Sequence, residues 1–291
     1  MKIYGIDFTS RPKQRKPITC LEATLQGTHL TAGDLTEWPS FEGFEEFLQR
    51  PGPWIAAVDF PFGQSRKFTQ NMGWPSSWQG YVNHVKTLER KGFRQALDSY
   101  RKSRPAGDKE HRRKTDIACG SISPQKLYGT PVGLMFFEGA PRLLEAGVTI
   151  PHLQQGDPKR IVVEGYPGVL ARKVMGKRSY KQDTKAKQTK DQHEARQDLL
   201  EQLTNGKAKQ LYGLTISAPE ALADDPGGDH LDALLCAIQA AWAYSHRAKS
   251  GRRDGRMDCR TGFPLPLIRR VGFRGGKQSA GSDERGRNCT R

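Results

Sequence analysis

Apolar and polar positions alternate in short runs along the first 60 residues, and these runs predict a small sheet with one helix. Residues 2–8, 17–25 and 28–35 read as three extended segments separated by turn residues, which is typical of an antiparallel meander. The stretch FEGFEEFL at 41–48 has its apolar residues at helical spacing. WIAAVDF at 54–60 is apolar, continuous and short, and therefore predicts a buried strand.

Later apolar runs predict one more buried strand and several helices. The region 78–103 contains two predicted helices, VGLMFFEGAPRLLEAG at 132–147 reads as a third, and 191–204 as a fourth. RIVVEGYP at 160–167 predicts a strand that ends at Glu164. The clearest helix lies within 227–246, where an apolar stripe recurs at helical spacing. The stripe consists of Leu231, Leu234, Leu235, Ile238, Ala241 and Trp242.

This order of elements predicts one α/β domain over residues 1–245 followed by a tail. Between about 62 and 132 the composition changes to aromatic, basic and polar residues, which indicates an insertion that either faces a ligand or is a plain surface excursion. Residues 246–291 contain 13 Lys/Arg against four Asp/Glu and are rich in Gly and Ser, so we expect a basic, disordered tail. Within it, FPLPLI at 263–268 could dock on the domain.

The charge of the chain favours an anionic partner. The 291 residues carry a formal net charge of +16, and the isoelectric point is near 9.8. Nucleic acid is the commonest polyanion that binds such a protein, and an anionic membrane surface is the competing interpretation. No apolar run is long enough to span a membrane and no secretion signal precedes the first strand, so we expect a cytoplasmic protein. The five cysteines lack paired CxxC spacing, which favours reduced thiols over a zinc site.

A strongly basic segment precedes the fourth predicted helix. Residues 172–190 contain eight Lys/Arg, Lys173 and Arg178 among them, against the single acid Asp183. Such a run is usually a solvated face or a mobile loop. The alternative is that its cations contact the phosphates of a nucleic acid, which would position the substrate without reading its sequence.

Acidic residues recur at the ends of predicted elements. Asp7, Asp59 and Glu164 each lie near the C-terminal end of an apolar strand, and Asp229 and Asp232 lie on one face at the start of the last helix. Mg²⁺ and Mn²⁺ prefer oxygen ligands, and a pair of such ions needs several convergent carboxylates. Without a cation, repulsion and desolvation would make that convergence costly. The pattern therefore predicts a site for Mg²⁺ or Mn²⁺.

Each acid also has an ordinary structural explanation. Asp7 could belong to a turn, and Asp59 could accept hydrogen bonds from the backbone of a loop. Asp229 follows two glycines and could be only the N-cap of its helix. Glu164 could form an ion pair with one of the many arginines. The combination of meander, later strand and acid-headed helix is more specific than any single residue.

Four blocks carry a resemblance to a known family. GIDF with the following Ser10, AVDFPFG, VVEGYPGVL and DHLDALLCAIQAAWA together resemble the predicted RNase H-like nuclease family catalogued as domain of unknown function 429. That family belongs to the wider fold group of retroviral integrases and Holliday-junction resolvases. The resemblance covers about residues 1–245 and implies a mixed sheet, in which an antiparallel three-strand meander is extended by parallel strands and flanked by helices.

The resemblance also implies roles for particular residues. Metal-binding acids of the fold group correspond to Asp7 and Asp59 on strands, and to the pair Asp229 and Asp232 on the last helix. Glu164 belongs to a block of the family itself, E-x-Y-P, and we group it with the catalytic acids. The block RRKTD resembles another part of the family pattern, which places its Arg113 and Asp116, together with Ser10, at the substrate side of the cleft. The basic segment and the tail have no counterpart in the family pattern.

These observations lead to a metal-dependent nuclease as the main functional hypothesis. Two Mg²⁺ or Mn²⁺ ions held by carboxylates would activate water and stabilise the leaving oxygen in phosphodiester hydrolysis. His230 could move a proton or point away. Trp74, Trp78 and Tyr81 could stack on unpaired bases or pack at the edge of the core.

Two other functions remain open. One is a non-catalytic protein that binds nucleic acid or another partner on the same fold. The other is an ATP-dependent, kinase-like enzyme, in which GIDFTSRPKQRK would hold phosphates, although such kinases need two core repeats and only one is evident. The kind of nucleic acid and the oligomeric state are not predicted.

Overall fold

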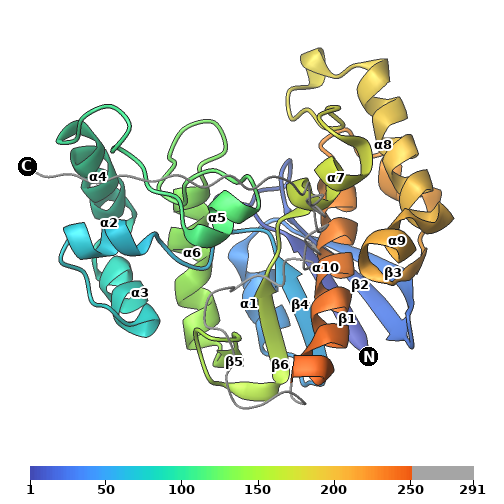
Figure 1. Ribbon diagram of the computed structural model, residues 1–291, viewed down its shortest axis with the longest axis horizontal. Helices are drawn as coiled ribbons and strands as arrows, with labels where there is room; N and C mark the ends of the chain where they lie inside the picture. Colours follow the sequence, from blue (N-terminus) through green and yellow to red (C-terminus); the bar gives the residue numbers. More distant parts are fainter. Residues whose placement is uncertain (251–291) are drawn as a thin grey trace, which may run out of the picture.

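A seven-stranded mixed sheet forms the centre of the protein, as a computed structural model that describes residues 1–250 shows (Figure 1). In spatial order the strands are β5 (Val148–Thr149), β6 (Asp157–Glu164), β4 (Trp54–Val58), β1 (Lys2–Asp7), β2 (Ile18–Gln26), β3 (His29–Trp38) and β7 (Thr215–Ser217). β2 runs antiparallel to its neighbours β1 and β3, and every other adjacent pair is parallel. The predicted meander extended by parallel strands is therefore confirmed.

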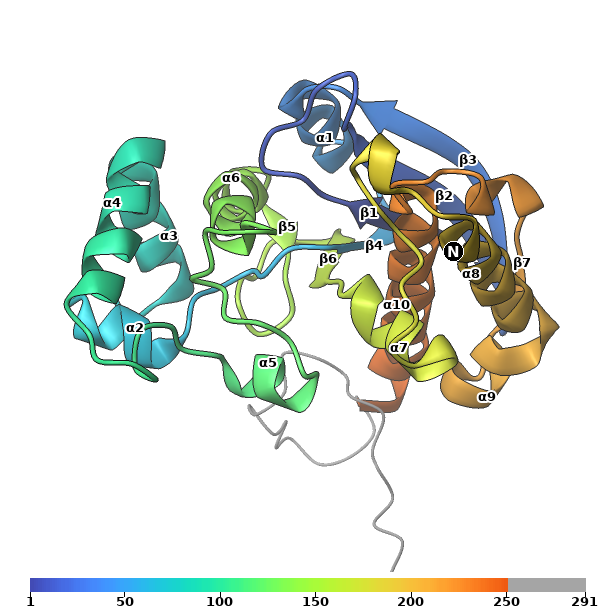
Figure 2. The ribbon, with the colours of Figure 1, turned by 90° about the horizontal axis from the view of Figure 1, so that it is seen from above.

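Helices cover both faces of this sheet (Figure 2). One face carries α1 and α6, with α2, α3 and α4 packed beyond α6, and the opposite face carries α7, α8, α9 and α10. The helices are α1 (Phe41–Leu48), α2 (Arg66–Asn71), α3 (Trp78–Thr87), α4 (Glu89–Lys102), α5 (Lys114–Ala118), α6 (Val132–Glu145), α7 (Pro167–Met175), α8 (Lys190–Gln202), α9 (Ala208–Tyr212) and α10 (Asp229–Ser250). A π-helical turn (Leu203–Lys207) joins α8 to α9, and two 3₁₀ turns are at Lys185–Lys187 and Glu220–Ala223.

The insertion predicted at about 62–132 contains α2 to α5. Three aromatic residues of this region, Trp74, Trp78 and Tyr81, are each at most 9% exposed and belong to the apolar core that includes α6. The Trp78 indole N–H donates a hydrogen bond to the Phe62 carbonyl. Their packing at the core is therefore confirmed, and they are not free to stack on bases.

Some predicted boundaries were wrong. The strand expected within 160–167 begins earlier, at Asp157, whereas its end at Glu164 is confirmed. Pro167 occupies the first turn of α7, where its missing N–H and fixed φ suit a helix start. α7 then takes up the beginning of the basic segment, which was expected to be a solvated face or loop. α10 continues to Ser250, and FPLPLI at 263–268 lies outside the described residues.

Within residues 1–250 no helix is long and apolar enough to cross a membrane.

Candidate metal centre

Three carboxylates that are far apart in the sequence meet where β1, β4 and α10 come together. One side-chain oxygen from each of Asp7, Asp59 and Asp232 lies within 4.8 Å of the other two. Asp232 is fully buried, Asp7 is 8% exposed and Asp59 is half-buried. The structure thus brings together three of the four residues that the sequence predicts as metal ligands.

The alternation of side chains along β1 directs Asp7 toward α10. Ile3 packs in the apolar cluster that contains α10, whereas Tyr4 and Ile6 pack in the cluster on the opposite face. Because side chains of a strand alternate between faces, Gly5 and Asp7 share the face of Ile3. The last residue of β1 therefore presents its carboxylate on the α10 side.

The same alternation applies to the neighbouring parallel strand. In β4, Ile55 and Ala57 belong to the cluster that contains α10. Asp59 follows them with the same parity, and its backbone N–H donates to the Ile6 carbonyl at 2.9 Å. This hydrogen bond continues the ladder beyond the end of β4 and holds Asp59 beside the end of β1.

A glycine allows α10 to reach this edge of the sheet. A Cβ atom built on Gly5 would lie 1.9 Å from the Ala233 carbonyl oxygen and 2.3 Å from the Ala237 nitrogen. Only a residue without a side chain permits such close packing of a helix backbone on a strand. Since Ala233 follows Asp232 directly, this contact brings the helix acid next to the strand acids.

The start of α10 is capped by a residue that was not predicted. The Asp225 carboxylate accepts hydrogen bonds from the backbone N–H of Asp229 at 2.6 Å and of His230 at 3.4 Å. The N-cap role considered for Asp229 is therefore wrong. Asp229 instead lies near Lys16, with 3.7 Å between its Oδ1 and the lysine Nζ, and it is not one of the three convergent acids.

Asp232 has two partners from the basic segment. The Tyr180 hydroxyl donates to its Oδ1, and the Lys181 ammonium forms an ion pair with its Oδ2. Asp232 is fully buried, whereas the side chain of Lys181 is 46% exposed and reaches it from the solvent side. Neither partner was predicted, because a basic run offers no sign of which cation reaches a buried acid.

Burial and the charges of neighbouring carboxylates dominate the electrostatics of the acids in and beside the cluster. Burial, followed by the charges of Asp229 and Asp232, raises the pKa of Asp7 well above its ordinary value. Burial and then the charge of Asp232 raise the pKa of Asp59 to about 7. Burial also raises the pKa of Asp229. A cation placed among these carboxylates would relieve both desolvation and repulsion, so the cluster favours cation binding.

Glu164 lies outside the convergent group, and strand register explains why. β6 pairs Glu164 with Val58 of β4, one residue before Asp59, and Val58 packs on the face opposite α10. On that face the Glu164 carboxylate accepts two hydrogen bonds from Arg113, at 2.5 and 2.8 Å, and one from the Phe62 N–H at 2.9 Å. The ion pair with an arginine, one of the two interpretations of this residue, is what the structure shows.

Arg113 and Asp116 belong to the same ion-pair network. Arg113 also contacts Asp116, at 2.7 Å between Nη2 and Oδ1, and Asp116 accepts from the Arg113 backbone N–H at 2.7 Å. Burial lowers the pKa of Arg113, but the charges and hydrogen bonds of Glu164 and Asp116 outweigh it, and that pKa is raised. These side chains are thus engaged with one another and link α5 to the end of β6.

The remaining residues that the sequence predicted for substrate binding are dispersed. Ser10 is buried, and its carbonyl accepts a hydrogen bond from Arg90. The Lys173 ammonium lies over the Tyr212 ring, 5.6 Å from its centroid. Arg178 is paired with two acids of α8, so its charge is largely met within the protein.

His230, considered as a proton carrier, is engaged elsewhere. Its Nε2 lies 3.1 Å from Oε1 of Glu37 on β3. The ring is therefore paired with Glu37 rather than with one of the three convergent acids.

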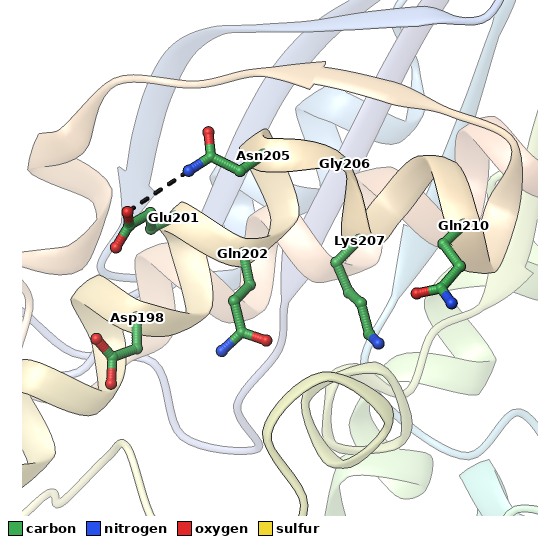
Figure 3. A pocket seen from close by; sticks show the side chains of 7 residues that line it. All are labelled: Asp198, Glu201, Gln202, Asn205, Gly206, Lys207 and Gln210. Carbon is green, nitrogen blue, oxygen red and sulfur yellow. Dashed lines mark hydrogen bonds between the residues drawn. The ribbon is translucent and has the colours of Figure 1, made fainter.

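A surface depression lies over the end of α8, the π-helical turn and α9 (Figure 3). Within it, the Asn205 amide donates to Glu201 at 3.5 Å, and Gly206 has a φ of +106° that lets the chain turn. The depression is lined by Asp198, Glu201, Gln202, Asn205, Gly206, Lys207 and Gln210. None of these belongs to an element that supplies a convergent acid, so we assign the depression no part in the metal centre.

The donor set of the centre suits a hard divalent cation. Three carboxylate oxygens are the kind of ligand that Mg²⁺ and Mn²⁺ prefer, and the cluster contains neither a thiolate nor an imidazole. The Lys181 ammonium already stands beside Asp232 as a cation. The residues present therefore fit such an ion, and the arrangement by itself does not select between the two metals.

Comparison with protein families gave a match. A family model described as "Protein of unknown function (DUF429)" matches residues 5–253, a range that contains all the acids described above. Searches among curated proteins and among solved structures gave no match.

Proposed function

The chain belongs to the DUF429 family of proteins of unknown function, and from that premise we propose that it is a metal-dependent nuclease that hydrolyses phosphodiester bonds. The observation that carries the proposal is the convergence of Asp7, Asp59 and Asp232 within 4.8 Å. Three acids that repel one another in a largely buried site need a compensating cation, and carboxylate-held divalent cations are the usual catalysts of phosphodiester hydrolysis.

The sheet supports an RNase H-like interpretation of the fold. β1, β2 and β3 form the meander, and β4 and β6 extend it on the β1 side as parallel strands. One acid is the last residue of β1, a second directly follows β4, and the third is in the first turn of α10. This is the distribution that the resemblance implies for the nucleases of that fold group.

In this proposal the protein's own residues position the reaction. Asp7, Asp59 and Asp232 provide oxygen ligands, and the Tyr180 hydroxyl orients the Asp232 carboxylate. A bound Mg²⁺ or Mn²⁺ would supply Lewis acidity toward a phosphodiester oxygen. Water is the attacking group, so no side-chain nucleophile is required. Lys181, at the solvent side of Asp232, places a positive charge where a phosphate would approach.

The charge of the protein supports nucleic acid as the substrate. The net charge of +16 favours a polyanion, and residues 101–114 alone contain seven Lys/Arg against two acids. Most of these cations are exposed, among them Arg101, Lys109 and Arg112. Such cations would position the phosphate backbone without reading its sequence.

The test is a cleavage assay with matched variants. Purified protein is incubated with labelled single-stranded, duplex, hybrid and branched nucleic acids, with and without Mg²⁺ or Mn²⁺. We expect cleavage that depends on the cation and that falls at least 100-fold in Asp7→Asn and in Asp59→Asn. The variant Asp34→Asn removes an exposed acid of β3 outside the convergent group and should cleave like the wild type. Cleavage that survives in Asp7→Asn would refute the proposal.

One observation favours a second candidate, a non-catalytic protein that binds nucleic acid. Lys181 and Lys16 already balance part of the charge of Asp232 and Asp229. If these ion pairs stabilise the acids without a metal ion, the wild type and all variants will bind nucleic acid and none will cleave it. Mn²⁺ will then not raise the thermal stability of the wild type.

A further inference from the structure

The charges around the metal centre do not cancel. Asp7, Asp59 and Asp232, the convergent acids, carry three negative charges when ionised. Lys181 at Asp232 supplies one positive charge, whereas Lys16 is shared between Asp229 and Asp183 outside the group. Two negative charges are left over among the convergent acids, and one divalent cation would neutralise them.

The number of carboxylate ligands also favours a single divalent cation. Within the described residues, the convergent group comprises three carboxylates, and two adjacent cations would need more shared ligands than these. The fourth acid, Asp229, has its Oδ1 3.7 Å from the Lys16 ammonium, and Lys16 is itself tied to Asp183 at 2.5 Å. A lysine therefore faces the acid that a second cation would have to use.

Lys181 is held in its place by the backbone around it. The N–H of Gln182 donates to the Pro226 carbonyl at 3.2 Å, and the buried Arg196 donates to the Tyr180 carbonyl at 3.0 Å. On the other side, Gly228 has a φ of +76°, and a Cβ atom there would lie 2.8 Å from the Cβ of Lys181. The segment on both sides of Lys181 is thus built into the turn before α10, unlike a solvated charge run.

We infer that the centre takes one divalent cation per chain and that the Lys181 ammonium occupies the position of a second. The inference rests on the proposed function, since it concerns the same site, and it replaces the pair of ions expected from the sequence. Lys181 acts here as a fixed monovalent charge on Asp232. Its side chain is 46% exposed, and its ammonium is held against the fully buried Asp232 carboxylate.

The experiment counts bound Mn²⁺ by equilibrium dialysis on the full-length protein without nucleic acid, and records the electron paramagnetic resonance spectrum of the bound ion. We expect one Mn²⁺ per chain with the spectrum of an isolated ion, and at least tenfold weaker binding in Asp7→Asn. Lys181→Met should take up a second Mn²⁺, because Asp232 then loses its fixed positive charge. Lys181→Arg should keep one.

Lys177→Met is the matched control, since it removes an exposed charge from the same segment and should leave the count at one. Two spin-coupled Mn²⁺ ions in the wild type would overturn the inference and leave the nuclease proposal standing. A count of one in both the wild type and Lys181→Met would also overturn it. No Mn²⁺ bound by the wild type would instead sink the proposed function, and the inference with it. If Lys181→Met does not fold, the wild-type count and the spectrum still decide.

Discussion

Gly5 of β1 and Ala233 of α10 are in backbone contact, and a Cβ atom on Gly5 would lie 1.9 Å from the Ala233 carbonyl oxygen. We therefore predict that Gly5→Ala forces α10 away from the sheet and destabilises the protein by about 3 kcal/mol or more, since neither backbone can yield as a side chain does. Urea denaturation measures this loss. Mn²⁺ binding should weaken as well, because the same contact positions Asp232.

Gly92→Ala is the control for that prediction. Gly92 lies within α4, where an added Cβ meets only the Leu88 side chain at 3.6 Å, an ordinary contact. Alanine is a better helix former than glycine, so this variant should be as stable as the wild type or more stable by up to about 1 kcal/mol. Equal destabilisation by the two substitutions would contradict the special role of Gly5.

The two acids at the start of α10 should respond differently to substitution. Asp232 belongs to the convergent group, whereas Asp229 is turned to Lys16. A ligand at 100 times its dissociation constant stabilises the folded state by about 2.7 kcal/mol, which for a domain of this size is roughly 5–10 °C in melting temperature. We expect Mn²⁺ to produce such a shift in the wild type, to lose it in Asp232→Asn and to retain most of it in Asp229→Asn. Thermal unfolding at several Mn²⁺ concentrations checks this, and equal losses in both variants would contradict it.

In the metal-free protein, the raised pKa of Asp59 should make the stability of the fold depend on pH. The pKa of Asp59 is raised to about 7 in the folded state by burial and by the charge of Asp232, from an ordinary value of 3.8. The folded state then binds the proton more tightly than the unfolded state, so ionised Asp59 lowers the stability of the fold. This penalty grows from about pH 4, is complete above about pH 7, and is relieved as the pH falls.

Asp59→Asn removes that titration. The melting temperature of this variant, minus that of the wild type, should rise between about pH 4 and pH 7 and then level off, when both are measured in chelator. Since one pKa unit corresponds to about 1.4 kcal/mol, the corresponding change in the free energy of unfolding should be on the order of a few kcal/mol. Gly92→Ala, which changes no ionisable group, supplies the reference curve. A difference that is independent of pH would show that Asp59 titrates normally.

The central strands and α10 could be predicted from sequence because their apolar residues recur with a clear period. β5 and β7 could not, since they contain two and three residues and such short runs show no pattern. The start of β6 was placed too late, because Asp157, Pro158 and Lys159 show no apolar pattern. Its end at Glu164 was predicted, and Pro167 marks the start of α7.

The site was predictable to the extent that it depends on strand ends. Asp7 ends an apolar strand and Asp59 follows one, both with the right parity, but VVE at the end of β6 looks the same as AVD, which runs from β4 to Asp59. The register that sets Glu164 opposite Val58, and so on the other face, depends on pairing between strands about 100 residues apart. Sequence periodicity does not contain that information.

The ion pair of Lys181 with Asp232 could not be predicted from sequence for another reason. Its partner Asp232 is 51 residues away, and the surrounding run contains many similar cations. The available signal was Tyr180, an aromatic residue inside a charged run, which proves to be buried and bonded to the same acid.

The ion pair of Arg113 and Glu164 should be structural in its effect. Both side chains are less than a fifth exposed, and removing one partner of a buried pair leaves the other charge unpaired. We expect Arg113→Met to destabilise the protein by about 3 kcal/mol. Arg178→Met breaks pairs that are more exposed and should lower stability much less. Similar losses of stability in the two variants, measured by urea denaturation, would show that burial of the Arg113–Glu164 pair does not increase its contribution to stability.

The basic residues beyond the family match should add affinity for nucleic acid without changing the preference between single strand and duplex. Residues 254–291 contain nine Lys/Arg against four Asp/Glu, and deleting them leaves the matched range 5–253 intact. For each phosphate that the protein no longer neutralises, the slope of log affinity against log salt should fall by about 0.9 on duplex DNA. We therefore expect weaker binding and a flatter slope, with the ratio of affinities for labelled single strand and duplex nearly unchanged. A full-length variant with these nine cations replaced by Gln should behave like the deletion, because the effect arises from charge. If the slope stays the same in both, these cations do not bind phosphate.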